Sequence, residues 1–422
     1  MSDNSIIEQQ GGDWLPQDSQ HTHHWLKRLV KSTDKHPQSL HPVLEELQDL
    51  VDDDSKLYML ATAMFDEIPD MPPYNEDPEG QQQVRDFEHC LQLMNSLLTV
   101  APKWSQRAED IGLIGCPFNA VLDWSMNTPS GFAFFIDDKV NAQMKKVLDQ
   151  WGVFLSSKES LSCLGTDPEG WFSDECKTAV VQAATHSSSS PKTFVENYVC
   201  QPDAEYHGYK SWDDFFTREF RDGVRPVTAP DDGHDLSIPN PQAVIVSACE
   251  SCPYRITTDI KERDKFWAKG QPYSLIDMVN GDELYSQFVG GTIYQAFLSA
   301  LSYHRWHSPV SGTIKKSYLV PGTYFSEPLS RGFSNADGPD PSAPTLSQSY
   351  ISAVATRAVM FIEADDPDIG LMCMIAIGMA EVSTCDVTVK EGQHVKKGDQ
   401  MGMFHFGVSS ACAGWRGMML TY

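Results

Sequence analysis

The sequence has little positive charge and no long hydrophobic run. Its 32 Lys and Arg residues stand against 58 Asp and Glu residues, giving a formal net charge of −26, which argues against a nucleic-acid partner or adsorption to an anionic membrane. No apolar run approaches the roughly 20 residues that span a bilayer. The first residues also lack the basic and apolar regions of a signal peptide. We therefore expect a cytoplasmic protein without a membrane span, in which the ten cysteines are reduced thiols.

The end of the chain lacks the acid and the histidine that a serine hydrolase would need. Gly407, Ser409 and Ala411 come within one residue of the Gly-x-Ser-x-Gly nucleophile elbow, whose acid and histidine lie further along the chain. Residues 410–422 contain no Asp, Glu or His. The sequence therefore excludes a hydrolase of this type built on Ser409.

The same stretch does contain a strand pattern followed by a turn of small residues. Residues 401–406 alternate in side-chain type, as in a strand with two different faces. The turn that follows contains Gly407, Ser409 and Ser410. Glycine permits backbone angles closed to other residues, so this turn could hold a serine hydroxyl close to a neighbouring carbonyl. An ordinary polar turn uses the same residue types, so the pattern alone leaves both interpretations open.

The first half of the chain has the periodicity of helices. Apolar side chains recur at three-to-four spacing in residues 43–51, 84–98 and 140–151. Pro42 suits the first turn of a helix because its missing N–H is not needed there. Gly152 can end the third segment. We predict three helices at these positions.

The second half has the pattern of strands, and the change comes at a short polar linker. Apolar runs with strand character occupy residues 243–248, 292–298, 359–363, 371–379 and 382–389. We predict an α+β fold. Its parts are a polar N-terminal segment at 1–40, a helical domain at 41–185, a linker at 186–191 and a sheet-rich domain at 192–422.

Three side chains near the predicted strands are candidates for chemistry. His304 and His307 follow the second predicted strand, and Pro309 argues against the helix that would let two histidines at this spacing share a metal. One could act as a base for a serine and the other as an acid for a bound substrate, since imidazole titrates near neutral pH. Both could instead be packed residues in a turn. Glu250, at the end of the first predicted strand, could orient a histidine or face solvent.

Four motifs resemble those of the phosphatidylserine decarboxylase family, in that family's order. They are Phe-Phe-Thr-Arg-Glu with Gly-x-Arg-Pro within 211–226, Lys-Gly-x-x-Tyr-Ser-Leu at 269–275, Tyr-His-Arg-x-His-x-Pro at 303–309 and Gly-Asp-x-Met-Gly-x-Phe at 398–404. As a set they are highly specific. Residues 151–158 and the third motif are more similar to one branch of the family, soluble fungal decarboxylases typified by the L-tryptophan decarboxylase of psilocybin biosynthesis.

The resemblance implies a cofactor made from the chain itself. In this family a serine attacks the preceding carbonyl to give an ester, and elimination then splits the chain and leaves a pyruvoyl group on the new amino terminus. The matching residues are Ser409 and Val408, in a turn with Gly407 and Ser410, so the products would be a large chain ending at Val408 and a small chain, 409–422. A ketone next to an amide can condense with an amine and withdraw the electrons released with CO2. Neither PLP nor a metal is expected.

The resemblance also implies a role for each candidate side chain. His307 matches the family's processing histidine, and His304 matches the histidine linked to decarboxylation. Glu250 stands near the position of the family's Pro-x-Asp-Gly carboxylate and is a candidate to replace it. The implied fold is an N-terminal helical domain followed by a sheet-rich, phosphatidylserine-decarboxylase-like catalytic domain.

These features lead to three hypotheses. The first is a self-processing decarboxylase of a free aromatic L-amino acid, with L-tryptophan as the expected substrate and tryptamine and CO2 as products. The missing membrane anchor favours it over the second, a phosphatidylserine decarboxylase. The third is an unprocessed, non-catalytic paralogue that acts as a binding protein, because the stiff, β-branched Val408 stands where the family has glycine. Relatives also continue past the serine with further strand-forming residues, so the stop at Tyr422 predicts a missing strand and an unpaired edge.

Overall fold

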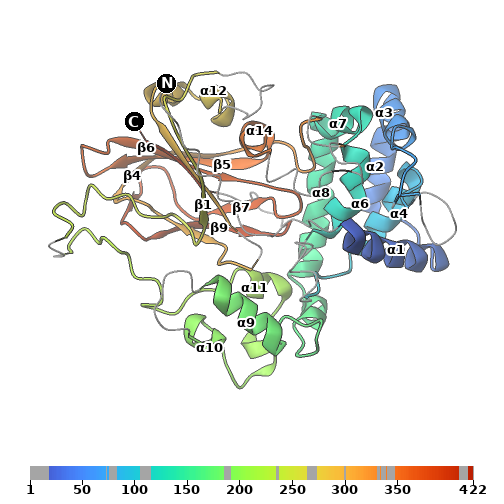
Figure 1. Cartoon of the computed structure of the whole chain (residues 1–422), viewed down its shortest axis with the longest axis horizontal. Helices are drawn as coiled ribbons and strands as arrows, with labels where there is room; N and C mark the ends of the chain where they lie inside the picture. Colours follow the sequence, from blue (N-terminus) through green and yellow to red (C-terminus); the bar gives the residue numbers. More distant parts are fainter. Residues whose placement is uncertain are drawn as a thin grey trace.

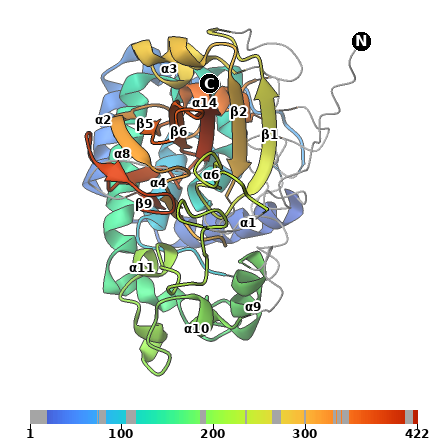
Figure 2. The same cartoon turned by 90° about the vertical axis from the view of Figure 1, so that its left-hand side faces the viewer.

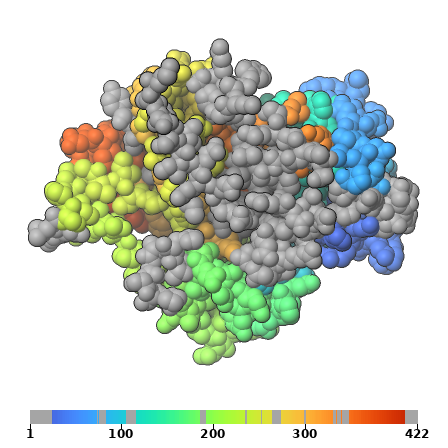
Figure 3. Space-filling view, viewed as in Figure 1, coloured from blue at the N-terminus to red at the C-terminus, as the bar shows by residue number. Residues whose placement is uncertain are grey.

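A helical part and a sheet-rich part pack side by side in the computed structural model of the chain (Figure 1). The structure describes residues 19–72, 74–75, 83–104, 116–184, 192–233, 237–263, 273–298, 301–329, 333, 339, 347–407 and 417–421. Figure 3 shows the same division at the surface, with the N-terminal helices in blue at one end. The predicted α+β fold class is confirmed. The domain boundaries stay predictions, and the linker at 186–191 lies outside the described residues.

The N-terminal part is a bundle of helices. Those that the structure describes are α1 (Ser19–Lys35), α2 (Pro42–Asp52), α3 (Ser55–Asp66), α4 (Phe87–Leu97), α6 (Pro117–Met126), α7 (Pro129–Phe135) and α8 (Asp138–Leu155). Several begin at an aspartate whose carboxylate accepts a hydrogen bond from the first-turn amides, as Asp54, Asp86 and Asp137 do. Helix α8 runs along the boundary with the sheet-rich part (Figure 1).

The three helices predicted from periodicity are confirmed as α2, α4 and α8. The expected stop at Gly152 is wrong, because α8 continues to Leu155. Burial of Trp151 and Leu155 in the core offsets the roughly 1 kcal/mol that an interior glycine costs a helix. The polar segment at the start also holds more structure than expected, since α1 buries Leu26 and Val30.

Short helices and an aromatic cluster connect the bundle to the sheets. They are η1 (Lys158–Cys163), α9 (Asp174–Ala183), α10 (Phe194–Asn197), η2 (Glu205–Gly208) and α11 (Trp212–Phe216). The rings of Trp171 and Trp212 lie 4.5 Å apart, and Phe172 packs edge-on against Phe215 at 5.3 Å. This cluster places α11, which carries the start of the Phe-Phe-Thr-Arg-Glu motif, beneath the sheets (Figure 1).

Two antiparallel sheets form the second part. The strands are β1 (Cys252–Thr258), β2 (Thr292–Phe297), β3 (Arg305–His307), β4 (Gly312–Val320), β5 (Arg357–Ala364), β6 (Leu371–Ile377), β7 (Thr384–Val387), β8 (His394–Val395), β9 (Gln400–His405) and β10 (Gly417–Thr421). One sheet has seven strands in the order β1-β2-β10-β6-β5-β4-β8, and the other has three in the order β3-β9-β7. Figure 2, from the sheet side, shows β1 and β2 side by side with the helices behind.

The large sheet is covered on both faces. Helices α12 (Leu275–Met278) and α14 (Gln348–Val354), with η3 (Glu283–Phe288), lie over one face. Along β5, Val359 and Phe361 join the cluster under these helices, whereas Met360 and Ile362 belong to the core shared with the N-terminal bundle. Burial on both sides explains the nearly continuous apolar sequence of β5 and β6.

Four of the five predicted apolar runs contain strands, β2, β5, β6 and β7, and the alternating stretch near the end forms β9. The run at 243–248 is an incorrect prediction. It makes single hydrogen bonds to its neighbours, such as Val246 N–H to Pro309 O at 3.0 Å, but no ladder that would make it a strand.

The predicted missing strand is also wrong, because β10 lies within the large sheet between β2 and β6. Met419 pairs with Tyr294 on one side and Met374 on the other. The segment after Ser409 therefore supplies an interior strand, whose backbone groups pair on both sides. Among the described residues, no helix is both long enough and apolar enough to cross a membrane.

Candidate active site

His304 is held at the meeting point of α11 and β9. It is fully buried, its ring stacks on that of Phe216 with centroids 3.7 Å apart, and its Nδ1 lies 3.2 Å from the Phe216 carbonyl oxygen. Its own carbonyl oxygen accepts a hydrogen bond from the Phe404 amide of β9 at 2.9 Å. Since a carbonyl only accepts, Nδ1 of His304 carries the proton in this contact.

His307 lies in β3 with both ring nitrogens engaged. Nδ1 is 2.8 Å from the Gly398 carbonyl oxygen and Nε2 is 3.2 Å from the Tyr303 hydroxyl. The carbonyl requires a proton on Nδ1, so in the neutral ring Nε2 is the acceptor. Burial lowers the pKa of His307 below its ordinary value. Burial thus favours the neutral ring, in which Nε2 is the nitrogen that can take up a proton and accepts from the Tyr303 hydroxyl.

Two arginines of the family-like motifs fix the backbone around these histidines. The buried Arg218 donates to the Leu301 and Ser302 carbonyl oxygens at 2.6 and 3.1 Å. Arg305 donates to the Thr217 carbonyl oxygen at 2.7 Å. The motif within 211–226 and the motif at 303–309 are thus joined by hydrogen bonds, which fix the position of β3 and its histidine.

Glu250 binds an arginine. Arg225 Nε donates to its Oε1 at 2.8 Å, and a second guanidinium nitrogen contacts the same oxygen. Burial raises the pKa of Glu250, and Arg225 opposes that effect. In the described part of the chain the hydrogen-bond partners of the His307 ring are Gly398 and Tyr303. The hypothesis that Glu250 orients this histidine by direct contact is therefore not supported.

Strand β9 leads from the histidines to Gly407. Phe406, next to Gly407, packs edge-on against Phe216 at 4.6 Å, and Phe216 in turn stacks on His304. The predicted nucleophile Ser409, its neighbour Val408 and Ser410 lie outside the described residues. His304 is thus linked to the start of the turn through Phe216.

Gly407 is required for a different reason from the one predicted. It is not among the residues with positive φ. Instead its backbone lies so close to α8 that an added Cβ would be 2.0 Å from the Leu148 carbonyl oxygen. No side chain fits there unless α8 moves, so the turn and α8 are in direct backbone contact.

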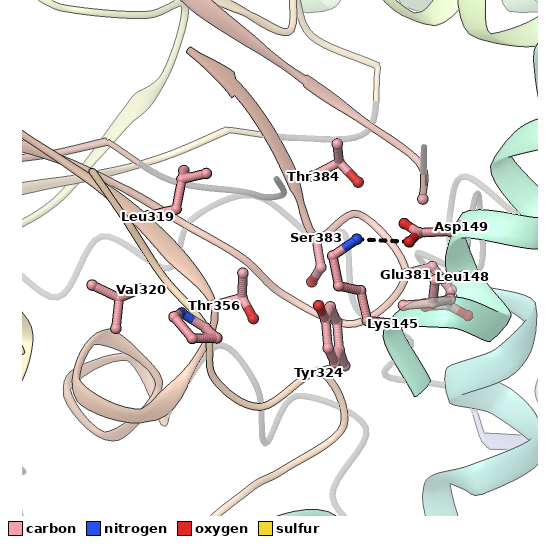
Figure 4. A pocket seen from close by; sticks show the side chains of 12 residues that line it. Lys145, Leu148, Asp149, Leu319, Val320, Tyr324, Thr356, Glu381, Ser383 and Thr384 are labelled. Carbon is pink, nitrogen blue, oxygen red and sulfur yellow. Dashed lines mark hydrogen bonds and ion pairs between the residues drawn. The ribbon is translucent and has the colours of Figure 1, made fainter. Parts of the chain in front are cut away.

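A cavity opens beside Gly407, between α8 and the ends of β4 and β7 (Figure 4). Its volume is about 120 Å³. Helix α8, the loops around β4 and β7, and the turn line it with Lys145, Leu148, Asp149, Leu319, Val320, Pro321, Tyr324, Thr356, Glu381, Ser383, Thr384 and Gly407. At its edge, Lys145 Nζ forms an ion pair with the Asp149 carboxylate at 2.6 Å.

Glu381 is the most unusual group in this cavity. It is fully buried, and burial raises the pKa of its carboxyl group to about 7. Its Oε1 accepts a hydrogen bond from the Asn119 amide of α6 at 2.7 Å, and the Cys116 thiol lies beside it. Sequence analysis missed Glu381. The available signal was a lone carboxylate in the otherwise uncharged stretch 369–385.

A second feature that sequence analysis missed is a hydrogen bond between a histidine of β9 and an aspartate of α11. His405 Nδ1 lies 2.8 Å from Asp213 Oδ1, and both side chains are largely buried. The pair ties the end of β9 to the helix under His304. Among the residues that the structure describes, no group of three or more His, Cys, Asp or Glu side chains could hold a metal ion.

Two family models match the chain. One described as phosphatidylserine decarboxylase covers residues 41–180, and a second with the same description covers residues 212–411. The second model covers β3, β9 and Ser409, and the first covers α8. The residues on the two sides of the cavity therefore match different family models.

Individual relatives fall into two groups. Decarboxylase iboD of Amanita muscaria is 47% identical over 70% of this chain and 82% of its own length. The L-tryptophan decarboxylase of Psilocybe cubensis is 37% identical over 88% of this chain and 80% of its own. The phosphatidylserine decarboxylase proenzyme of Shewanella putrefaciens is 26% identical over 55% and 79%. The chain is thus more similar to the two fungal decarboxylases than to this bacterial proenzyme.

Proposed function

Because the chain belongs to the phosphatidylserine decarboxylase family, we propose that it is a self-processing, pyruvoyl-dependent decarboxylase of a free aromatic L-amino acid. The proposed substrate is L-tryptophan, converted to tryptamine and CO2. The observation that carries this proposal is the 37% identity to an L-tryptophan decarboxylase over 88% of the chain. Bacterial phosphatidylserine decarboxylases match about half of the chain at lower identity, for example 26% over 55%. We place the protein in the cytoplasm on the sequence pattern alone.

Self-processing requires that the Ser409 hydroxyl lose a proton while its oxygen attacks the Val408 carbonyl carbon. An imidazole suits this step if its unprotonated nitrogen exchanges its hydrogen-bond donor for the serine hydroxyl. We assign it to His307, whose Nδ1–H donates to Gly398 O and whose Nε2 is the acceptor.

As the ester between Val408 and the Ser409 oxygen forms, the peptide C–N bond between these residues breaks and the nitrogen of residue 409 becomes a free amine. Elimination then breaks the Cβ–O bond, which releases the large chain as a carboxylate ending at Val408 and leaves an enamine at residue 409. Water hydrolyses the imine tautomer of this enamine and ammonia leaves, so that the small chain begins with the pyruvoyl group.

Decarboxylation would use the pyruvoyl group to withdraw electrons from the substrate. The residues of this chain have simpler tasks. His304, packed on Phe216, is the group that we propose to hold or deliver a proton near the reacting carbon. Helix α8 lies against the backbone of Gly407, and we propose that it limits the access of water to the reacting group.

Two alternatives lead to different measurements. A phosphatidylserine decarboxylase would turn over phospholipid, so both substrates must be assayed side by side. An unprocessed binding protein would remain one chain, because the stiff Val408 crowds the carbonyl that Ser409 attacks. Val408→Gly should then accelerate cleavage.

Intact-mass measurement tests the proposal directly. The purified protein should contain a large fragment ending at Val408 and a peptide of residues 409–422 with a blocked amino terminus, whereas Ser409→Ala should stay whole. Borohydride reduction in the presence of radiolabelled tryptamine should tag the small peptide. An uncleaved chain that still decarboxylates L-tryptophan would refute the pyruvoyl mechanism, and turnover of phospholipid alone would refute the substrate.

A further inference from the structure

The nitrogen that the proposed cleavage needs as a base already accepts a hydrogen bond. The Tyr303 hydroxyl oxygen lies 3.2 Å from Nε2 of His307. Because Nδ1 donates to the Gly398 carbonyl oxygen at 2.8 Å, the neutral ring has its acceptor at Nε2 and the tyrosine hydroxyl is the donor. Burial raises the pKa of Tyr303, so this hydroxyl keeps its proton. An imidazole nitrogen has one lone pair, so Tyr303 and a serine hydroxyl compete for it.

Tyr303 is held in place by a stack of rings. Its side chain is buried, and its ring lies on that of Phe220 with centroids 4.3 Å apart and an angle of 24° between the planes. Phe220 in turn packs against the Tyr198 ring at 5.0 Å and under the Arg225 guanidinium, which lies 4.5 Å from its centroid. The stack therefore fixes the hydroxyl beside Nε2.

The charged groups around this pair do not depend on the tyrosine hydroxyl. Burial is the main cause that lowers the pKa of His307, the nearby Arg305 lowers it further, and the backbone carbonyl and Asp399 oppose both effects. Arg305 forms an ion pair with Glu219 at 3.0 Å. Glu250 binds the guanidinium in the ring stack. All these groups remain when the hydroxyl is removed, so a change at His307 would then report the hydroxyl itself.

We infer that Tyr303 is a positioning residue for self-cleavage, whose hydroxyl holds His307 in one tautomer and orientation and must leave Nε2 before the serine hydroxyl can donate to it. The serine proton then passes to Nε2, while the tyrosine keeps its own proton. The inference rests on the proposed function, because it takes His307 as the base. It deepens that function by naming the group that controls this base. Since a hydrogen bond must break first, the hydroxyl slows cleavage while it orients the ring.

Tyr303→Phe tests this role because it removes the hydroxyl and keeps the stacked ring. Cleavage should become about two- to twelvefold faster, the equilibrium value of one neutral hydrogen bond. Radiolabelled methionine incorporated during cell-free synthesis follows the reaction on a gel, since the released peptide contains Met418 and Met419.

Tyr318→Phe is the matched control. It removes a hydroxyl that donates to the Val279 carbonyl oxygen at 2.8 Å, in the cluster under α12. This variant should be cleaved at the rate of the parent protein.

A measurement on the uncleaved protein tests the hydrogen bond apart from cleavage. In Ser409→Ala with isotope-labelled histidine, an NMR titration gives the pKa of His307, whose signal is assigned from its absence in a His307→Ala variant. A donor to Nε2 favours the neutral ring, so Tyr303→Phe should raise this pKa by about 0.4 to 1.1. Tyr318→Phe should leave it unchanged. If Tyr303 served only to pack its ring, Tyr303→Phe would leave it unchanged too.

These outcomes separate the inference from the proposed function. If the parent is cleaved but Tyr303→Phe is cleaved at the same rate or more slowly, the inference is overturned while the proposed function stands. If the parent is never cleaved, the proposed function fails, and the pKa comparison alone decides whether Tyr303 holds His307. Should Tyr303→Phe not fold, the nitrogen chemical shifts of His307 in Ser409→Ala decide it, because a neutral ring with its proton on Nε2 would overturn the inference.

Discussion

Glu381→Gln should make the protein less sensitive to alkaline pH. Burial raises the pKa of the Glu381 carboxyl from its ordinary 4.5 to about 7 in the folded chain. A carboxyl with a raised folded pKa favours folding while it is protonated, so its contribution is fully present below pH 4.5 and is lost as the pH rises through 7. At 1.36 kcal/mol per pKa unit, the whole loss is about 3 kcal/mol. About 2 kcal/mol of it falls between pH 5.5 and pH 8.

Gln is the suitable replacement because it resembles the protonated acid and cannot ionise. Its amide oxygen can still accept the Asn119 amide hydrogen bond. We expect the free energy of unfolding of the variant, relative to the parent, to increase by about 2 kcal/mol from pH 5.5 to pH 8. All other titrating groups are common to both proteins and cancel in the difference.

Guanidinium unfolding followed by tryptophan fluorescence provides the measurement. Both proteins should carry Ser409→Ala, so that each is one chain and unfolds reversibly. The linear dependence on denaturant gives the free energy at each pH. If the difference in free energy of unfolding between variant and parent stays constant from pH 5.5 to pH 8, the argument that Glu381 is buried as a protonated acid is refuted.

Three further substitutions test the roles of the turn and the histidines. His307→Ala should block cleavage, and normal two-fragment maturation of this variant, measured by intact mass, would remove His307 from this role. Because burial lowers the pKa of His307, cleavage of the parent protein should still proceed at a pH slightly below 6.5. His304→Ala should cleave but decarboxylate poorly, and full activity in a CO2-release assay would reject its assignment. Gly407→Ala should destabilise the protein by about 1–3 kcal/mol, because the new Cβ would overlap the Leu148 carbonyl oxygen of α8. An unchanged Tm in thermal unfolding would contradict this close approach.

Sequence periodicity predicted those helices and strands in which buried side chains recur at a regular spacing. Helices α2, α4 and α8 follow apolar periodicity, and the continuous apolar runs of β5 and β6 reflect burial on both faces. The run at 243–248 has similar composition, but it makes only single hydrogen bonds to the segment around β3, such as His307 N–H to Ala248 O at 2.7 Å, and no ladder. Composition alone cannot separate these cases, since strand formation depends on a partner elsewhere in the chain.

Site residues could be predicted from the sequence only where a short motif contains side chains of a chemically reactive type. His304 and His307 could be singled out from a short motif. The partners of the site residues lie far away in sequence, as with His405 and Asp213, 192 positions apart. The burial of Glu381 likewise depends on the Asn119 amide, 262 positions distant. Such contacts come from the packing of the two parts of the fold, which no local pattern encodes.

The interior position of β10 has a consequence for the lifetime of the proposed enzyme. After cleavage at Ser409, the fourteen-residue peptide 409–422 would have no covalent link to the rest of the protein, and the hydrogen bonds of β10 to β2 and β6 would retain it. Unfolding would release this peptide together with the reactive carbonyl at its first residue. Reassembly would then require two molecules to meet, and the serine needed to make a new carbonyl would be gone. Heat inactivation should therefore be irreversible for the mature protein and reversible for its uncleaved precursor.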